Sequence, residues 1–366
     1  MKSFIKANKF RLISAVLITV LTISTFSNIS SSFYQISNGI SLFSAGFFVP
    51  GGIDKVFYSG GKNLSDKISY EVFHKGETAK TESSTQMVLG TPTESWDIKE
   101  ENKGVINEVQ YLYSQGGNII SSGSGYVKNS TNHSNEEVLN IISGKPDISL
   151  KFDGRIEVLI LHTHATECYN PYDSGFFDKT APTRDSDNEN NMVRVGAVLT
   201  SELKKLGVGV VHSTTKHDVT FNGAYNREAQ TVKEYMEKYP DIKIIIDLHR
   251  DAIEPDANTR VKPTAVINGK KAAQIMILSG CENGNMNFPD WAENLRLNAL
   301  LENHIESAYP GLTKPVFFNY SKYNQNLSTG ATLIEIGSHA NTLSEAEYSA
   351  KLIAKPIYEA LLELKG

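Results

Sequence analysis

The chain lacks the features that mark several classes of protein. It has only two cysteines among 366 residues, Cys168 and Cys281, which is too few for a disulfide framework. Basic residues are not in excess, since the formal net charge is -5, and no basic stripe stands out. There is no internal repeat. These absences exclude a disulfide-stapled scaffold and give no sign of nucleic-acid binding, and the length suits one or two domains with a substantial core.

Charged residues are also absent from one long stretch near the start, because none occurs between Arg11 and Asp54. Three lysines and Arg11 precede a run, residues 12–26, that consists mainly of apolar residues. This pattern is typical of a targeting segment whose basic end stays inside while the rest of the chain faces outward. The apolar run is short for a full span, and no small-x-small cleavage site follows it. We expect residues 1–30 to be a membrane anchor, with a cleaved leader as the alternative.

Residues 31–150 have a different composition, rich in serine, asparagine, glycine and lysine, with weak periodicity. Turn-forming runs such as 59–63 and 114–118 interrupt it repeatedly. We expect a loop-rich extracytoplasmic stalk or small N-terminal region without catalytic chemistry. Residues 151–366 would then form the catalytic domain.

Beyond residue 150, strand and helix patterns alternate. The predicted strands are 156–161, 208–211, 242–248, 261–267, 274–279, 316–320 and 331–337, and the predicted helices are 191–206, 223–239, 289–308 and 344–364. Apolar strands alternating with helices predict an α/β fold with a mostly parallel, twisted sheet flanked by helices. Ligands of such sheets bind beyond the carboxyl ends of the strands.

Two of the predicted strands lead directly into potential metal ligands. His164 and Glu167 form an H-x-x-E arrangement after strand 156–161, and His249 follows strand 242–248. Imidazole nitrogen and carboxylate oxygen are ligands that zinc accepts, and a catalytic zinc typically has three protein ligands and one open position. If the two strands are parallel neighbours, these side chains meet at one edge of the sheet. His162 remains a competitor for the place of His164.

A carboxylate inside another apolar strand completes the candidate site. Glu335 lies in the predicted strand 331–337, where a buried carboxylate without a purpose would be costly. It is the candidate general base that would take a proton from the attacking water and pass it to the leaving amine. Asp247 is a candidate acceptor that orients the imidazole of His249. Arg250, Asn341 and Arg227 are candidate substrate contacts.

Several blocks together resemble the stage II sporulation protein P family. They are HTHATE at 162–167, NMVRVG at 191–196, DLHRDA at 247–252 and LIEIG at 333–337, followed by Asn341 and Thr342. The resemblance covers roughly residues 150–366, and the joint occurrence of the blocks is what makes it specific. It implies a domain similar to zinc-dependent N-acetylmuramoyl-L-alanine amidases and, more distantly, to zinc carboxypeptidases.

The family resemblance also implies a function. It implies hydrolysis of peptidoglycan at the bond between N-acetylmuramic acid and L-alanine, with Zn²⁺ as cofactor, and leaves endopeptidase activity on peptide cross-links open. It further implies work beside the stage II sporulation proteins D and M during engulfment of the forespore, at the mother-cell membrane facing the space around the forespore. Two alternatives stay open: a zinc endopeptidase of stem peptides only, and a catalytically silent cell-wall-binding domain.

One departure from the amidase pattern affects the ligand set. Muralytic amidases often take their zinc glutamate from the segment before the first helix, where this chain has Glu189. Either Glu167 or Glu189 therefore remains a candidate. We favour Glu167 because only two residues separate it from His164.

Overall fold

The computed structural model describes residues 98–366. The expected membrane anchor at residues 1–30 lies outside these residues, as does most of the expected stalk. Within the described part, no helix has the length and apolar character needed to cross a membrane.

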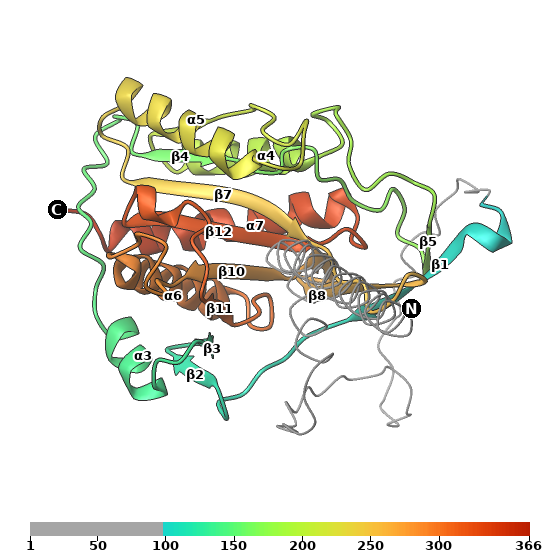
Figure 1. Ribbon diagram of the computed structural model, residues 1–366, viewed down its shortest axis with the longest axis horizontal. Coiled ribbons are helices and arrows are strands. Elements are labelled where there is room, and N and C mark those ends of the chain that lie inside the picture. The colour runs from blue at the N-terminus through green and yellow to red at the C-terminus, as the bar shows by residue number, and fades with distance from the viewer. Residues whose placement is uncertain (1–97) are drawn as a thin grey trace, which may run out of the picture. The chain divides into compact units, whose positions relative to one another are not determined.

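The largest element is an eight-stranded sheet in the order β2-β3-β11-β10-β12-β7-β4-β6. Its strands are β2 (Ile119–Ser122), β3 (Gly125–Ser130), β4 (Val158–Leu161), β6 (Val210–His212), β7 (Ile244–Asp251), β10 (Ile275–Gly280), β11 (Val316–Asn319) and β12 (Gly330–Ser338). Figure 1 shows β4, β7, β12 and β10 one below another in the middle of the molecule. The two longest, β7 and β12, are buried along their whole length, as the runs of Ile and Leu within them predict.

The sheet is mixed, so the prediction of a mostly parallel sheet is confirmed only in part: five of its seven strand pairings are parallel and two are antiparallel. The neighbours β4, β6, β7 and β12 pair in parallel, as expected for strands joined through helices. However, β10 pairs antiparallel with β12, and β2 pairs antiparallel with β3. An apolar run such as β10 gives the same pattern in both directions, so its orientation is set by its partners and not by its composition.

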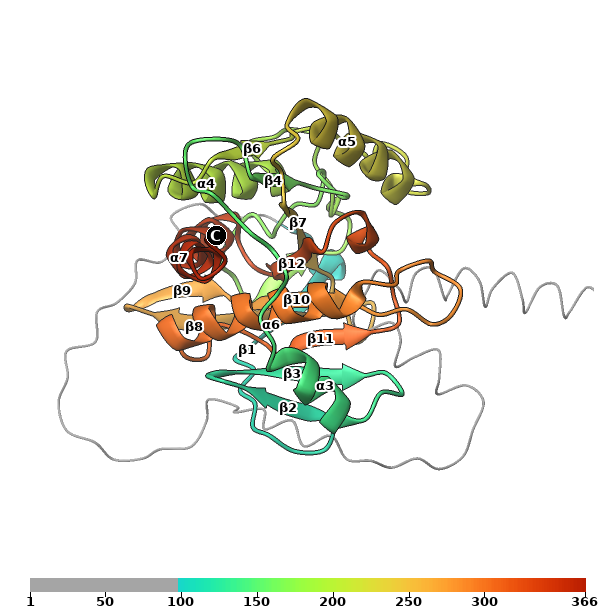
Figure 2. The same ribbon diagram turned by 90° about the vertical axis from the view of Figure 1, so that its left-hand side faces the viewer.

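Helices cover both faces of this sheet. They are α3 (Asn135–Ile142), α4 (Met192–Lys205), α5 (Ala224–Lys238), α6 (Trp291–Ala308) and α7 (Leu343–Leu362). Alternate residues of β7 join different clusters: Ile244 and Ile246 pack in the large core with α4, α6 and α7, whereas Ile245 packs with Val232 of α5. Figure 2 shows α4 and α7 to the left of the central strands and α5 to the right.

A smaller four-stranded sheet has the order β5-β1-β8-β9. Its strands are β1 (Lys103–Val109), β5 (Phe176–Asp178), β8 (Thr259–Ile267) and β9 (Lys270–Ala273). This sheet forms the right-hand end of the molecule in Figure 1.

The described part of the region before residue 151 contains strands that belong to the two sheets. A loop-rich stalk was expected there, yet β1 pairs in parallel with β8, and β3 pairs in parallel with β11. Both partners belong to the region from residue 151 onward. The described part of the region before residue 151 therefore supplies strands to the same sheets that carry the candidate site, because these short strands find partners far along the chain.

Local sequence signals fix the ends of the helices near the site. The side chain of Asn191 accepts a hydrogen bond from the backbone N–H of Val193 and caps α4, and Gly207 follows its end with a φ of 87°. Thr342 and Glu345 form a capping box at the start of α7. The cap of α4 ends the segment that follows β4, and the cap of α7 ends the loop that follows β12.

Candidate active site

Strand pairing brings His249 and Glu335 together. The two residues are register partners on the parallel strands β7 and β12, so their side chains point to the same face of the sheet. The sequence suggested that His249 follows β7. Since this strand continues to Asp251, His249 instead lies inside it. The opposite face of the two strands belongs to the apolar core, where Leu248 and Ile334 are fully buried. The polar pair thus lies on the α5 side.

The turn after β4 supplies the other two expected residues. His164 and Glu167 are both buried, and Oε2 of Glu167 lies 3.7 Å from Nδ1 of His249. The imidazole rings of His164 and His249 have centroids 5.3 Å apart and stand almost perpendicular. The backbone N–H of Arg250 donates a hydrogen bond of 3.2 Å to Oε2 of Glu167, which ties the turn to β7. The structure therefore brings His164, Glu167, His249 and Glu335 to one site.

Asp247 orients the imidazole of His249. Its Oδ2 accepts hydrogen bonds from Nε2 of His249, at 2.8 Å, and from the hydroxyl of Thr163. Its Oδ1 accepts a hydrogen bond from the backbone N–H of Thr163. With Nε2 bound in this way, Nδ1 is the nitrogen that faces Glu167. The contact is the one expected for a carboxylate that fixes a ligand imidazole.

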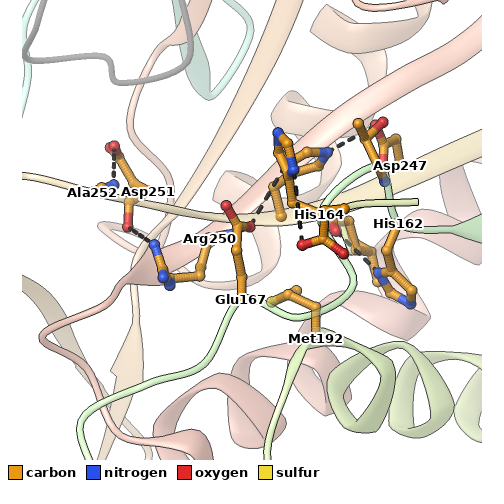
Figure 3. Close-up of polar contacts among 12 residues, drawn as sticks. His162, His164, Glu167, Met192, Asp247, Arg250, Asp251 and Ala252 are labelled. Atoms are coloured by element: carbon orange, nitrogen blue, oxygen red, sulfur yellow. Dashed lines mark hydrogen bonds and ion pairs between the residues drawn. The ribbon is translucent and has the colours of Figure 1, made fainter. Parts of the chain in front are cut away.

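The two competing ligands lie in different surroundings. His162 is fully buried, with Nδ1 3.0 Å from the carbonyl oxygen of Leu248 and Nε2 2.8 Å from Nε2 of His212. Glu189 is exposed and forms an ion pair of 2.9 Å with Arg194. Figure 3 shows Arg250, Glu167 and His164 in sequence across the site, with His162 to the right. The geometry thus favours His164 over His162 and Glu167 over Glu189.

The electrostatic environment differs among three of these residues, His164, His249 and Glu335. Burial lowers the pKa of His164 to about 4, so this imidazole is neutral at pH 7. Burial acts in the same sense on His249, but Asp247, Glu167 and Glu335 outweigh it and raise its pKa to about 10. Burial raises the pKa of Glu335 to about 8, with His249 opposing the shift.

One oxygen of Glu335 has no protein partner. In the part of the chain that the structure describes, Oε2 of Glu335 is buried and makes no hydrogen bond. Leaving such a group unsatisfied costs about 1–3 kcal/mol. An atom of this kind at the carboxyl edge of a sheet marks a place where a ligand or substrate atom is expected.

Two of the three expected substrate contacts, Arg250 and Asn341, make hydrogen bonds within the fold. Arg250 donates through Nε to the carbonyl oxygen of Cys168 and through its Nη atoms to those of Asp251 and Thr183. The amide of Asn341 donates to the carbonyl oxygen of Pro263 and to Glu345, while its oxygen accepts from Ser338. These contacts fix the loops around the site.

Arg227 has a similar role in another loop. Its guanidinium donates to the carbonyl oxygens of His217, Thr220 and Asn222. The side chain therefore holds the segment 217–222 in place, and its nitrogen atoms are engaged by the protein itself.

Three further residues near the site were not found from the sequence. Asp218 is buried and lies 3.9 Å from Nδ1 of His164. Phe221 stacks on the imidazole of His164 at 4.9 Å between ring centroids, with an interplanar angle of 3°. Arg184 lies 3.6 Å from Oε1 of Glu167 and 2.5 Å from Asp218. All three lie in loops, where no periodic pattern points to them.

The donor set has the composition of a catalytic zinc site, although its atoms do not stand at coordination distances. Among residues 98–366, no group of three or more His, Cys, Asp or Glu side chains has a geometry that could hold a metal ion. The chemistry of the donors does fit: a neutral imidazole, a carboxylate and a second imidazole oriented by Asp247 lie together beside the unsatisfied oxygen of Glu335.

Comparison with known proteins places the chain in a family. The family model described as Stage II sporulation protein P (SpoIIP) matches residues 59–358. This chain belongs to that family. A curated relative, the Stage II sporulation protein P of Bacillus subtilis (strain 168), is 29% identical over 209 residues, which are 54% of this chain and 49% of the relative. The chain thus spans about half the length of the curated relative it matches.

Solved structures give weaker likenesses. The N-acetylmuramoyl-L-alanine amidase AmiC2 of Nostoc punctiforme has a TM-score of 0.36 at 14% identity, covering 57% of this chain and 98% of its own. The N-acetylmuramoyl-L-alanine amidase from Clostridium difficile 630 has a TM-score of 0.34 at 17% identity, covering 58% and 97%. Scores this low carry no conclusion about fold or activity.

Proposed function

We propose that this chain is a zinc-dependent peptidoglycan hydrolase that cleaves the amide bond between N-acetylmuramic acid and L-alanine. Family membership supports the substrate class, and the relative's name supports a role in sporulation. The observation that carries the proposal is the unsatisfied Oε2 of Glu335, in register with His249 and beside Glu167.

His164, Glu167 and His249 would hold the metal. Zinc bound by two imidazoles and a carboxylate acts as a Lewis acid on a carbonyl group and lowers the pKa of water. The neutral state of His164 leaves a nitrogen lone pair for a ligand bond. Asp247 keeps Nε2 of His249 occupied, so Nδ1 faces the site, and His249 would release its Nδ1 proton on binding the metal, because only the neutral imidazole can be a ligand.

Glu335 carries the proton in the proposed reaction. With a pKa of about 8, the side chain is only partly ionised at pH 7; in its ionised form it removes a proton from the attacking water at Oε2, and the resulting carboxyl group donates that proton to the leaving nitrogen. The buried position excludes bulk water from this transfer, and the backbone of β12 holds the side chain opposite His249. Such a positioned base typically contributes about 10²- to 10⁴-fold to the rate.

The wider biological proposal follows the family. We infer that the protein is anchored by residues 1–30 at the mother-cell membrane, faces the space around the forespore, and works during engulfment with the stage II sporulation proteins D and M. These points rest on family membership and on the N-terminal sequence pattern.

Two measurements on the full chain test the proposed function. Zinc content by atomic spectroscopy is expected to reach about one ion per chain. Mass spectrometry of digested peptidoglycan is expected to show stem peptides with a free L-alanine amino terminus. Cleavage confined to bonds inside the stem peptide would instead indicate an endopeptidase. Intact glycan and peptide together with no bound zinc would indicate a silent wall-binding domain.

A further inference from the structure

Three arginines surround the candidate site, and their hydrogen bonds distinguish them. The guanidinium groups of Arg250 and Arg227 donate from Nε and both Nη atoms to backbone carbonyl oxygens. Their donors are therefore occupied within the fold. Arg184 is different, because Nη1 alone makes its hydrogen bonds, to Asp218 and to the hydroxyl of Thr166.

Backbone pairing fixes the place of Arg184 beside the turn after β4, which carries His164 and Glu167. Glu167 and Arg184 form an antiparallel bridge, flanked by hydrogen bonds from Cys168 to Thr183 and from Asp185 to Thr166. The side chain consequently lies against Glu167, with Nη2 3.6 Å from Oε1, while Oε2 of the same carboxylate faces His249. The carboxylate of Glu167 thus lies between the guanidinium of Arg184 and the proposed ligand His249.

One edge of this guanidinium makes no hydrogen bond within residues 98–366, although its Nη2 forms a loose ion pair of 3.6 Å with Glu167. This edge consists of the Nε and Nη2 atoms of Arg184, and 34% of the side chain is exposed. These two atoms carry parallel N–H groups, the arrangement that binds both oxygens of a carboxylate at once. The opposite edge is held by Asp218, so the fork is already oriented and little rotamer freedom remains to be lost on binding.

Phe221 completes this rim of the site. The Arg184 guanidinium lies over the Phe221 ring at 5.2 Å from its centroid, and the same ring stacks on His164. Phe221 is 43% exposed, so the rim combines an apolar surface with a cationic fork. A peptide with a carboxylate near its scissile amide matches both features.

We propose that Arg184 is a substrate-binding residue whose Nε–Nη2 edge pairs with a carboxylate of the stem peptide close to the scissile amide. This inference rests on the proposed function, since it names the part of the substrate that the same site recognises. It replaces Arg250 in that role, because the fork of Arg250 is occupied by carbonyl oxygens.

Binding to two muropeptides tests the assignment. The first carries a free carboxylate on the residue after L-alanine, and in the second the same group is amidated. The full chain carries Glu335→Gln, so that turnover is too slow to consume the ligand during the measurement and the result does not depend on which bond the enzyme cuts. Addition of Arg184→Gln is expected to raise the Kd for the acidic muropeptide roughly 10- to 100-fold. The Kd for the amidated muropeptide should change little.

Two further variants control for folding. Arg184→Lys keeps the charge beside Asp218 but loses the planar fork, so an intermediate Kd for the acidic muropeptide is expected. Arg155→Gln removes an arginine that pairs with Asp153 and Asp241 just before β4, away from the site, and should alter neither Kd.

Some results would overturn the assignment. An equal rise in both Kd values would show that Arg184 only supports Glu167 and Asp218. The assignment is also wrong if the Glu335→Gln chain has no preference between the two muropeptides, or if Arg184→Gln changes neither Kd. Failure of the proposed function is recognised separately, when the wild-type chain cleaves peptidoglycan at another bond or does not cleave it. The binding preference is measured without catalysis and does not depend on that result.

Discussion

Two buried glutamates, Glu335 on β12 and Glu302 on α6, have similarly raised pKa values but differ in their hydrogen-bond partners. Burial raises the pKa of each to about 8. Glu302 accepts hydrogen bonds from the backbone N–H of Tyr126 and from the hydroxyl of Thr313. Glu335 retains an oxygen without a protein partner within the described residues, and it faces His249 across the strand pair.

The comparison shows that a raised pKa alone does not identify a functional carboxylate. Glu302 is a structural group: it fastens the start of β3 to α6, and a Cβ added at Gly125 would lie 1.7 Å from its Oε2. The difference is in hydrogen-bond satisfaction and in neighbours. A buried acid that the fold satisfies stabilises the fold, whereas one left unsatisfied beside imidazoles is available to a substrate.

The largest expected effect separates the two glutamates directly. Glu335→Gln removes the proposed base and should lower kcat/KM for peptidoglycan digestion by about 10²- to 10⁴-fold, with the melting temperature preserved. The matched Glu302→Gln should keep the wild-type kcat/KM within roughly a factor of two, because it lies outside the site. Turbidity loss of peptidoglycan suspensions measures both. Comparable losses in the two variants would remove the distinction.

A smaller effect is expected from the residue that orients His249. Asp247→Asn should weaken zinc binding about 10- to 100-fold, because the amide is a poorer acceptor for Nε2–H of the imidazole. Competition with a zinc chelator measures the affinity. Asp241→Asn, which alters an exposed partner of Arg155, is the control. Unchanged zinc affinity in Asp247→Asn would show that His249 is not a ligand held by this carboxylate.

A third expected effect concerns stability and involves Glu302. Its folded-state pKa, about 8, exceeds the value of 4.5 for a free glutamate, so the folded state keeps a proton that the unfolded state releases. This contribution to stability is full below pH 4.5 and is lost as the pH rises toward 8. Glu302→Gln should therefore reduce the fall in unfolding free energy over this range, by at most about 1.4 kcal/mol per pH unit.

Urea unfolding at several pH values tests this point. Glu101→Gln, at an exposed position in the short 3₁₀ helix before β1, should keep the wild-type slope. If Glu302→Gln also keeps that slope, Glu302 is ionised in the folded protein, and its likeness to Glu335 disappears.

The sequence predicted the elements that carry the site because their signals are local. The β-branched runs of β4, β7 and β12 and the helical periodicity of α4 and α5 indicated their positions within a few residues. The end of β7 was missed because residues 249–251 are polar, and their strand conformation comes from pairing with β12. The prediction that His249 lies at the same edge as His164 came from two strands expected to be parallel neighbours, whereas the pairing of His249 with Glu335 comes from the register of β7 and β12.

Other parts depend on contacts that no local pattern reports. The antiparallel β10 lies between β11 and β12 through long-range pairing, and β3 joins the sheet edge in the same way. Arg184 and Asp218 reach the site from loops, through a bridge to Glu167 and hydrogen bonds to Thr166. Residue type alone likewise could not show that the guanidinium groups of Arg250 and Arg227 bind carbonyl oxygens.

The parallel pairing of β1 with β8, and of β3 with β11, has a consequence for the order of folding. Val105 meets Thr259, and Val127 meets Val316, so the earliest described strands wait for partners that are synthesised more than 150 residues later. Closing loops of this size precedes any gain from the contacts, which makes such topologies slow to assemble. A ribosome that stalls before residue 316 would leave β3 without its partner β11, with unpaired backbone groups open to aggregation.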